Sequence, residues 1–163
     1  MDDLFYQNGA VYRKTSETHK KYFYEDGTVK TVETYLDGHL HGQTLLYWPN
    51  GELKRKCTFV KGMRDGVDQM YSEEGVLLDE GSYKLGKAIE YHRRYNQVGK
   101  LIEEIEYLDE SRFNLRSWDE TGELCVEAIW TDSKTYHERV WDRFQKIWIE
   151  KRGIWDGKKL VYL

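Results

Sequence analysis

Aromatic and aliphatic residues alternate with polar ones along most of the chain, and short turn signals interrupt this alternation at regular intervals. Each signal ends in a glycine, and the six glycines are Gly9, Gly27, Gly51, Gly75, Gly99 and Gly122. Glycine adopts positive φ without strain, and the residue before it is often Asn or Asp, so each signal predicts a tight β-hairpin turn. The intervals of 18, 24, 24, 24 and 23 residues indicate a repeat protein whose first unit is irregular.

Apolar residues keep fixed distances from these glycines. Four residues before them stand Phe5, Phe23, Tyr47, Tyr71, Tyr95 and Trp118, and eight residues after the last five stand Tyr35, Phe59, Tyr83, Tyr107 and Trp130. These offsets differ by even numbers, which places the side chains on one face of a strand. Intervening positions such as Lys54, Lys56 and Thr58 are polar. We therefore expect an antiparallel sheet with one buried side, in which the aromatic rows form most of the core.

A second set of glycines marks the turns that join one hairpin to the next: Gly38, Gly62 and Gly86, with Gly42 and Gly66 four residues after the first two. In the fourth unit Glu110 replaces the first link glycine, so residues 108–113 predict a more open link. The predicted fold is all-β, an elongated open antiparallel β-meander of hairpin repeats. We expect one domain over 1–163, with an irregular N-terminal hairpin (1–18), regular repeats (19–132) and a degenerate capping repeat (133–163).

The last thirty residues fit two structures. Tyr136, Val140, Trp141, Phe144 and Ile147 match one face of a helix that begins after Ser133 and ends at Gly153. Counting 23 residues on from Gly122 instead gives Gln145, with an aromatic residue four positions before it and an aliphatic residue two positions after it. This agreement favours a seventh hairpin, followed by a final strand over 158–163.

Composition narrows the functional classes. The net charge of −4, from 25 basic and 29 acidic residues, gives no positive excess for a nucleic-acid backbone. No export signal or long apolar stretch is present, so we expect a cytoplasmic protein. Cys57 and Cys125 are then two reduced cysteines rather than a disulfide.

The segment from Tyr47 through Asn50, Gly51 and Leu53 to Phe59, Gly62 and Gly66 resembles the bacterial MORN-variant repeat. The resemblance covers about residues 19–132. It implies an open antiparallel sheet and a protein partner, since many bacterial members are described as antitoxin-like or immunity-like partners of a toxin. Eukaryotic relatives are tied to membrane and protein scaffolding, which implies association with a phospholipid surface as the alternative.

The residues give no indication of catalysis. His39 and His41 form a His-x-His pair in a link turn, but no third ligand stands nearby, so we predict no metal site and no cofactor. Glu104 and Glu106 lie near Arg93 and Arg94 in one predicted hairpin, where cross-strand ion pairs explain them better than acid–base chemistry. We therefore predict a protein without enzymatic activity.

Function is then expected on the surface. Tyr24 and Trp48 stand three residues before a turn glycine, outside the aromatic rows, and exposed aromatic residues often anchor interfaces. The candidate partner-binding residues are Tyr24, Trp48, Arg93, Arg94, Glu104 and Glu106. We expect a non-enzymatic scaffold that binds and neutralises a partner protein. Exposed sheet edges also permit a homodimer.

Overall fold

Alternating turn and strand signals produce a structure made only of β-strands. The computed structural model describes residues 3–163, and no helix occurs among them. Accordingly, no helix in this part of the chain is long and apolar enough to cross a membrane. The chain divides into two compact units: unit 1 ends at Ala88, and unit 2 comprises Ile89–Leu163. The all-β prediction is confirmed, and the expectation of one domain stays a prediction.

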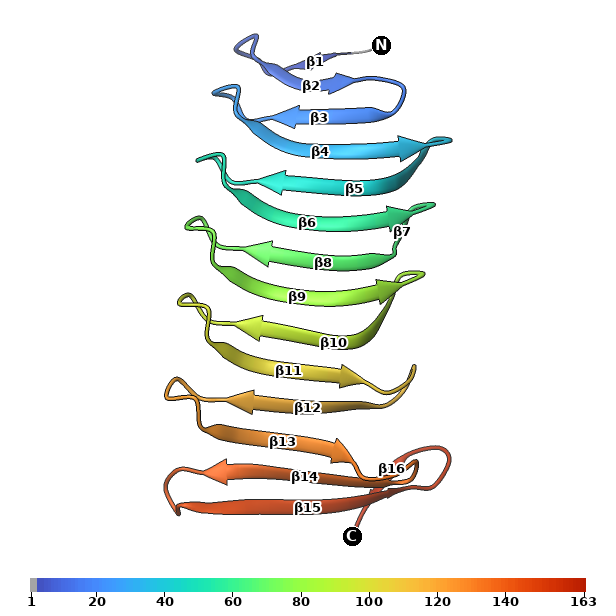
Figure 1. Cartoon of the computed structure of the whole chain (residues 1–163), viewed down its shortest axis with the longest axis vertical. Coiled ribbons are helices and arrows are strands. Elements are labelled where there is room, and N and C mark those ends of the chain that lie inside the picture. The colour runs from blue at the N-terminus through green and yellow to red at the C-terminus, as the bar shows by residue number, and fades with distance from the viewer. Residues whose placement is uncertain (1–2) are drawn as a thin grey trace. The chain divides into compact units, whose positions relative to one another are not determined.

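Unit 1 is an antiparallel meander in which each strand, apart from the short β7, pairs with the next one along the chain (Figure 1). Its strands are β1 (Leu4–Phe5), β2 (Val11–Thr15), β3 (His19–Phe23), β4 (Val29–Leu36), β5 (His39–Tyr47), β6 (Leu53–Val60), β7 (Met63–Arg64), β8 (Gly66–Tyr71) and β9 (Leu77–Lys84). The short β7 pairs with β6 beside β8.

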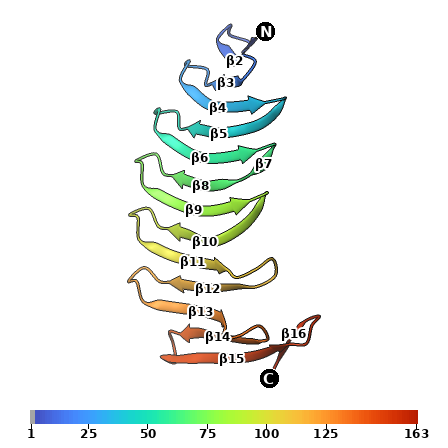
Figure 2. The same ribbon diagram turned by 45° about the vertical axis from the view of Figure 1, so that its right-hand side comes forward.

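Unit 2 continues the pattern and begins inside β10. Its strands are β10 (Lys87–Tyr95), β11 (Leu101–Tyr107), β12 (Phe113–Trp118), β13 (Leu124–Trp130), β14 (Thr135–Asp142), β15 (Ile147–Trp155) and β16 (Leu160–Tyr162). Each again pairs antiparallel with its sequence neighbour. Turned by 45°, the strands of each unit still lie in a single layer (Figure 2).

The six predicted hairpin turns are confirmed. Their glycines all have positive φ, from 77° at Gly99 to 92° at Gly122. A β-bulge lies beside each of these six turns, and all six bulges have the same register. Leu46 pairs with Arg55, whereas the next residue, Tyr47, pairs with Leu53, so Lys54 is left opposite no partner. Such a bulge bends the strand and redirects the side chain of the extra residue.

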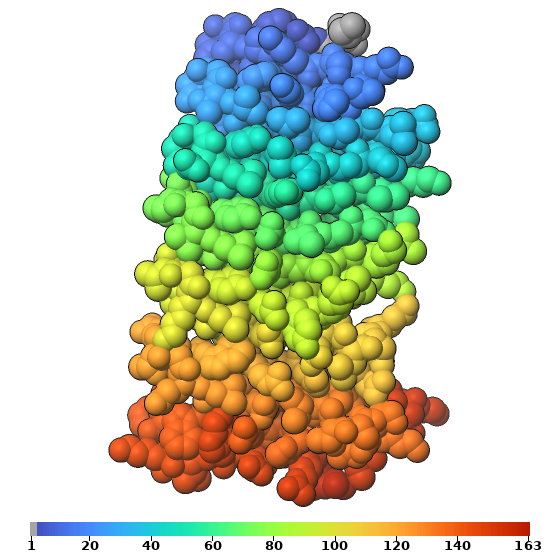
Figure 3. Space-filling model, viewed as in Figure 1, coloured from blue at the N-terminus to red at the C-terminus, as the bar shows by residue number. Residues whose placement is uncertain are grey.

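The core is thinner than the aromatic rows predict. The buried hydrophobic residues are Cys57 and Ala128, whereas Tyr47, Tyr71 and Trp118 stay half-buried. The physical reason is that the described strands of each unit belong to a single sheet and no helix packs on them. The space-filling view shows the hairpins of each unit following one another in chain order (Figure 3). The chain exposes 10882 Å², against roughly 8600 Å² for a compact monomer of this mass.

The C-terminal segment forms hairpins, so the helical alternative is wrong and the favoured hairpin is confirmed. Strand β14 pairs with β15 from Thr135↔Ile154 to Asp142↔Ile147. The turn differs by one residue from the predicted position, since Lys146 and not Gln145 has positive φ. The reason is local: the Asp142 carboxylate accepts the backbone N–H groups of Phe144 and Gln145, which holds a four-residue turn.

The predicted open link between β11 and β12 is also present. The Asp109 carboxylate accepts the backbone N–H groups of Ser111 and Arg112, both at 2.9 Å, in the place where earlier links use glycine. The Arg112 guanidinium donates a further hydrogen bond to Asp109 at 2.7 Å. The bond from the Ser111 amide and, next to it, this guanidinium bond hold the pKa of Asp109 far below its usual value.

Candidate partner-binding surface

Tyr24 and Trp48 lie where a strand enters a hairpin turn, and each reaches the next hairpin of unit 1. The Tyr24 hydroxyl donates a 2.8 Å hydrogen bond to the backbone oxygen of Tyr47. The Trp48 indole N–H donates a 3.1 Å hydrogen bond to the backbone oxygen of Tyr71. In both cases the acceptor lies 23 residues further along the chain. The polar atoms of these two aromatic side chains therefore connect successive repeats.

The bulge residues cover the same rings. The Lys30 ammonium lies 5.4 Å from the centre of the Tyr24 ring, and the Lys54 ammonium lies 4.0 Å from the centre of the Trp48 ring. Lys30 and Lys54 are the residues that the bulges leave without a partner. Both aromatic side chains are half-buried. Their structural role is thus visible, and their role in partner binding stays a prediction.

Tyr6 belongs to the same series of aromatic residues as Tyr24 and Trp48, although sequence reasoning missed it. Its hydroxyl donates a 2.8 Å hydrogen bond to the backbone oxygen of Phe23. The signal was present in the sequence, because Tyr6 stands three residues before Gly9, as Tyr24 does before Gly27. Ser72 takes this position before Gly75; it is buried, and its hydroxyl accepts N–H groups of its own turn.

Arg93 and Glu104 are part of a charged row that crosses five strands of unit 2. The row consists of Arg93, Glu104, Arg116, Glu127 and Arg139, which stand opposite one another in strands β10 to β14. Arg93 donates to Glu104 at 2.8 Å, Arg116 to Glu127 at 3.0 Å, and Arg139 to Glu127 at 2.9 Å. Arg116 also lies 3.8 Å from Glu104. The expected cross-strand ion pairing is present and extends well beyond one hairpin.

Glu127 is the carboxylate of the charged row that accepts hydrogen bonds from two arginines. Its burial opposes ionisation, but the hydrogen bond from Arg116 and the charge of Arg139 outweigh this cost, so the pKa of Glu127 is lowered. Its side chain is 17% exposed, less than those of its two arginine partners. The ionised form is therefore the one that the fold stabilises.

The other predicted charges are also paired. Glu106 accepts hydrogen bonds from Asn114 at 2.9 Å and from Tyr91 at 2.8 Å, and these two bonds lower its pKa. Arg94 donates to Glu103 at 3.0 Å. Adjacent residues of a strand point to opposite faces, so this pair lies on the face opposite the charged row. The candidate charges are thus distributed over both faces and do not form one patch.

Sequence reasoning placed Arg116 near the acidic residues of the preceding hairpin but missed Glu127 and Arg139, and with them the row. The signal was their spacing, since Arg93, Arg116 and Arg139 recur every 23 residues and Glu104 and Glu127 are also 23 apart. A smaller cluster in unit 1 was missed as well. The buried Asp68 accepts bonds from Arg55 at 2.8 and 2.6 Å and lies 3.3 Å from Arg64.

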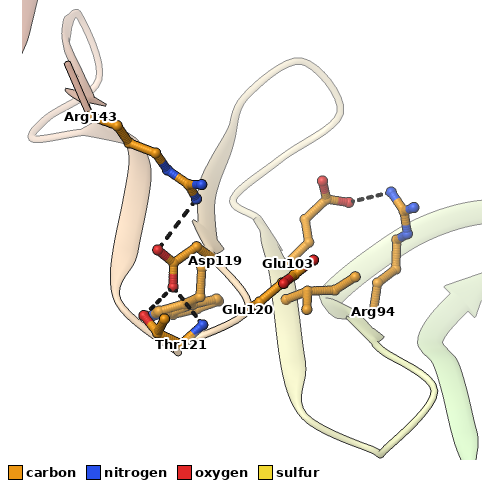
Figure 4. A pocket seen from close by; sticks show the side chains of 8 residues that line it. Arg94, Glu103, Asp119, Glu120, Thr121 and Arg143 are labelled. Carbon is orange, nitrogen blue, oxygen red and sulfur yellow. Dashed lines mark hydrogen bonds and ion pairs between the residues drawn. The ribbon is translucent and has the colours of Figure 1, made fainter.

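A cavity of about 460 Å³ opens at the hairpin turns of unit 2 (Figure 4). Its lining residues are Arg94, Ile102, Glu103, Trp118, Asp119, Glu120, Thr121 and Arg143. Asp119 accepts a 2.6 Å hydrogen bond from the Thr121 hydroxyl and lies 3.3 Å from Arg143. Arg94 is engaged by Glu103 on the other side. Each of the two arginines in the lining therefore lies beside a carboxylate, Arg143 beside Asp119 and Arg94 beside Glu103.

His39 and His41 line a cavity of about 320 Å³ with Leu36, Asp37 and Lys61. His39 Nδ1 lies 2.8 Å from the backbone oxygen of Asp37. Within residues 3–163 no group of three His, Cys, Asp or Glu residues is arranged to hold a metal ion. Cys57 and Cys125 are free thiols, and burial raises the pKa of Cys57.

Comparison with known protein families finds a match for one hairpin of the chain. No curated protein matches the chain. Residues 40–61 match the family described as MORN repeat variant. The matched segment runs from β5 through the turn at Gly51 to the end of β6. The resemblance predicted from Tyr47, Gly51 and Phe59 is therefore confirmed for this hairpin, which is similar to the MORN repeat variant.

Proposed function

We propose that the protein is a non-enzymatic binding scaffold of the antitoxin or immunity type, which binds a partner protein and neutralises it. The observation that supports this most is the single-layered sheet. Because no helix covers the described strands, most of their side chains stay at least partly accessible, and the exposed area exceeds that of a compact monomer of equal mass. Repeat proteins use such extended surfaces for binding.

The way the charges are held agrees with a binding role. Each unit contains a buried or half-buried carboxylate that arginine engages: Asp68 is engaged by Arg55, and Glu127 is engaged by Arg116. Paired charges of this kind stiffen a surface and orient it, and a stiff surface loses little freedom on binding. The MORN repeat variant at residues 40–61 supports a repeat-based scaffold of the same kind.

Co-expression with the product of each neighbouring gene tests the proposal. We expect one product to arrest growth when expressed alone and to form a stable complex with this protein, which restores growth. If every neighbouring product is harmless and none binds the purified protein at micromolar concentration, the antitoxin proposal is wrong.

A further inference from the structure

Strand β15 is far more exposed than the strands that occupy the same place in other hairpins. Seven of its nine residues are exposed, whereas none is exposed in β11 or β13. The cause is its pairing. β15 pairs with β14 over eight residues but with β16 only over Gly153–Trp155. Within the described part of the chain, residues 147–151 therefore have a neighbouring strand on one side only.

The direction of the backbone groups along this edge follows from one hydrogen bond. The backbone N–H of Leu163 donates to the backbone oxygen of Arg152 at 2.8 Å, so this oxygen points away from β14. Backbone groups of alternate residues in an antiparallel strand point to the same side. The N–H and C=O groups of Trp148 and Glu150 therefore also point away from β14, where a further strand would meet them.

The side chains along the edge are apolar and basic, except for Glu150, which lies opposite Arg139 with its carboxylate 3.4 Å from His137 of β14. Ile147 and Ile149 lie on one face and are 48% and 46% exposed, beside the exposed Val140 of β14. Lys151 follows on the same face, and Arg152 comes next in the strand. Phe144 in the adjacent turn is 98% exposed. Exposed apolar residues gathered in this way mark interaction sites.

Charge separates this segment from the rest of the chain. Residues 133–163 hold eight Lys and Arg against four Asp and Glu, a net charge of +4. Residues 1–132 hold the other 17 basic and 25 acidic residues, a net charge of −8. A second copy of the chain would bring a second basic edge against the first. Opposite charge is what attracts a partner and sets its register.

We infer that residues 147–151 of β15 dock an extended acidic segment of the partner protein, which adds as a further strand. The inference rests on the proposed function and names the site and the partner's chemistry. The added strand exchanges backbone hydrogen bonds with Trp148 and Glu150, a recognised way of binding extended peptides. It places an apolar side chain beside Ile149 and a carboxylate beside Lys151. Charges on an edge also discourage unspecific pairing.

Two capped synthetic peptides test the site on the full chain. One repeats valine, threonine and glutamate, and the other has lysine in place of every glutamate. We expect the acidic peptide to slow amide hydrogen exchange at Trp148 and Glu150 and to bind at least about tenfold more tightly than the basic one. Equal binding of the two peptides, or no protection of these two amides, overturns the inference.

Two variants separate backbone pairing from charge. Glu150→Pro removes an outward N–H that no strand uses and an exposed carboxylate that lies 3.4 Å from His137. Because exposed pairs contribute little, the thermal unfolding midpoint stays close to wild type, while peptide binding falls at least about tenfold. Lys151→Glu leaves the backbone unchanged, and we expect it to reverse the preference between the two peptides. If the proline variant fails to fold, this charge variant still tests the β15 site. Retained preference for the acidic peptide in Lys151→Glu contradicts the inference.

The same variants distinguish this inference from the proposed function. Suppose that wild type, Glu150→Pro and Lys151→Glu all bind and neutralise one neighbouring gene product equally tightly. This result supports the antitoxin proposal and overturns the β15 site. If the acidic peptide binds at β15 but no neighbouring gene product is neutralised, the β15 site is supported and the antitoxin proposal is overturned. Binding of wild-type protein to anionic vesicles, lost in Lys151→Glu while neither peptide binds, assigns the edge to a membrane surface and overturns the inference.

Discussion

The indole N–H of Trp48 donates a hydrogen bond to the backbone oxygen of Tyr71, 23 residues further along the chain. Tyr24 and Tyr47 are related in the same way, also across 23 residues. These bonds join the turn of one hairpin to the strand end of the next, in addition to the ladder bonds between strands. In a single layer with few buried side chains, such connections between repeats contribute a notable share of the stability.

Removing one of these connections should therefore destabilise the protein. We expect Tyr24→Phe to lower the free energy of unfolding by about 1 kcal/mol, because the backbone oxygen of Tyr47 loses its donor. Urea denaturation followed by circular dichroism measures the change. Tyr162→Phe, at an exposed tyrosine of β16, is the matched control and should change the free energy of unfolding little. Equal effects of the two variants would show that the hydrogen bond contributes nothing.

The charged row predicts a second loss of stability. Glu127→Gln removes the carboxylate that accepts bonds from both Arg116 and Arg139. We expect the free energy of unfolding to fall by roughly 1–2 kcal/mol at low salt, and by less at high salt because mobile ions screen the wild-type pairs. Glu123→Gln, at an exposed turn residue, serves as the control. A loss independent of salt would argue against an electrostatic origin.

The lowered pKa of Glu127 predicts how stability depends on acid. A carboxyl group whose pKa is lower in the folded than in the unfolded state stabilises the fold above its unfolded value of 4.5. This contribution is lost as the pH falls from about 4.5 through the lower folded value. Denaturation at a series of pH values should show wild type losing more stability than Glu127→Gln over that window. Parallel curves for the two proteins would contradict the assignment.

Glu90 occupies a backbone conformation that suits glycine. It has φ 57°, and it stands 24 and 48 residues after Gly66 and Gly42, which have φ 114° and 92°. A left-handed conformation costs a non-glycine residue roughly 1 kcal/mol, so Glu90→Gly should raise the free energy of unfolding by about 0.5–1 kcal/mol.

The reciprocal variant supplies the control. Gly66→Ala places a Cβ 3.4 Å from Thr58 Cβ at a positive φ, and it should destabilise the protein by about 1–2 kcal/mol. Chemical denaturation of both variants compares the two positions. Destabilisation by Glu90→Gly would mean that the Glu90 side chain stabilises the fold by more than its backbone strain costs.

Several features of the candidate site were within reach of sequence reasoning and others were not. The pairing of Arg93 with Glu104 was expected, because both lie in one hairpin whose turn at Gly99 sets the register. Arg116 and Arg139 belong to later hairpins, and only the register across three further turns places them in the same row. Tyr24 and Trp48 were expected to be exposed, but bulges at Lys30 and Lys54 direct the lysines over their rings.

The sequence by itself determined the hairpin turns, the 24-residue period and the alternation of side chains, because each depends on local backbone preferences or on spacing along one strand. Glycine at positive φ and a period of two suffice for these features. The tertiary structure decided what no local pattern contains: the thin core, the charged row across five strands and the partly unpaired edge of β15. These depend on which strands become neighbours, on the bulges that shift their register and on the short length of β16.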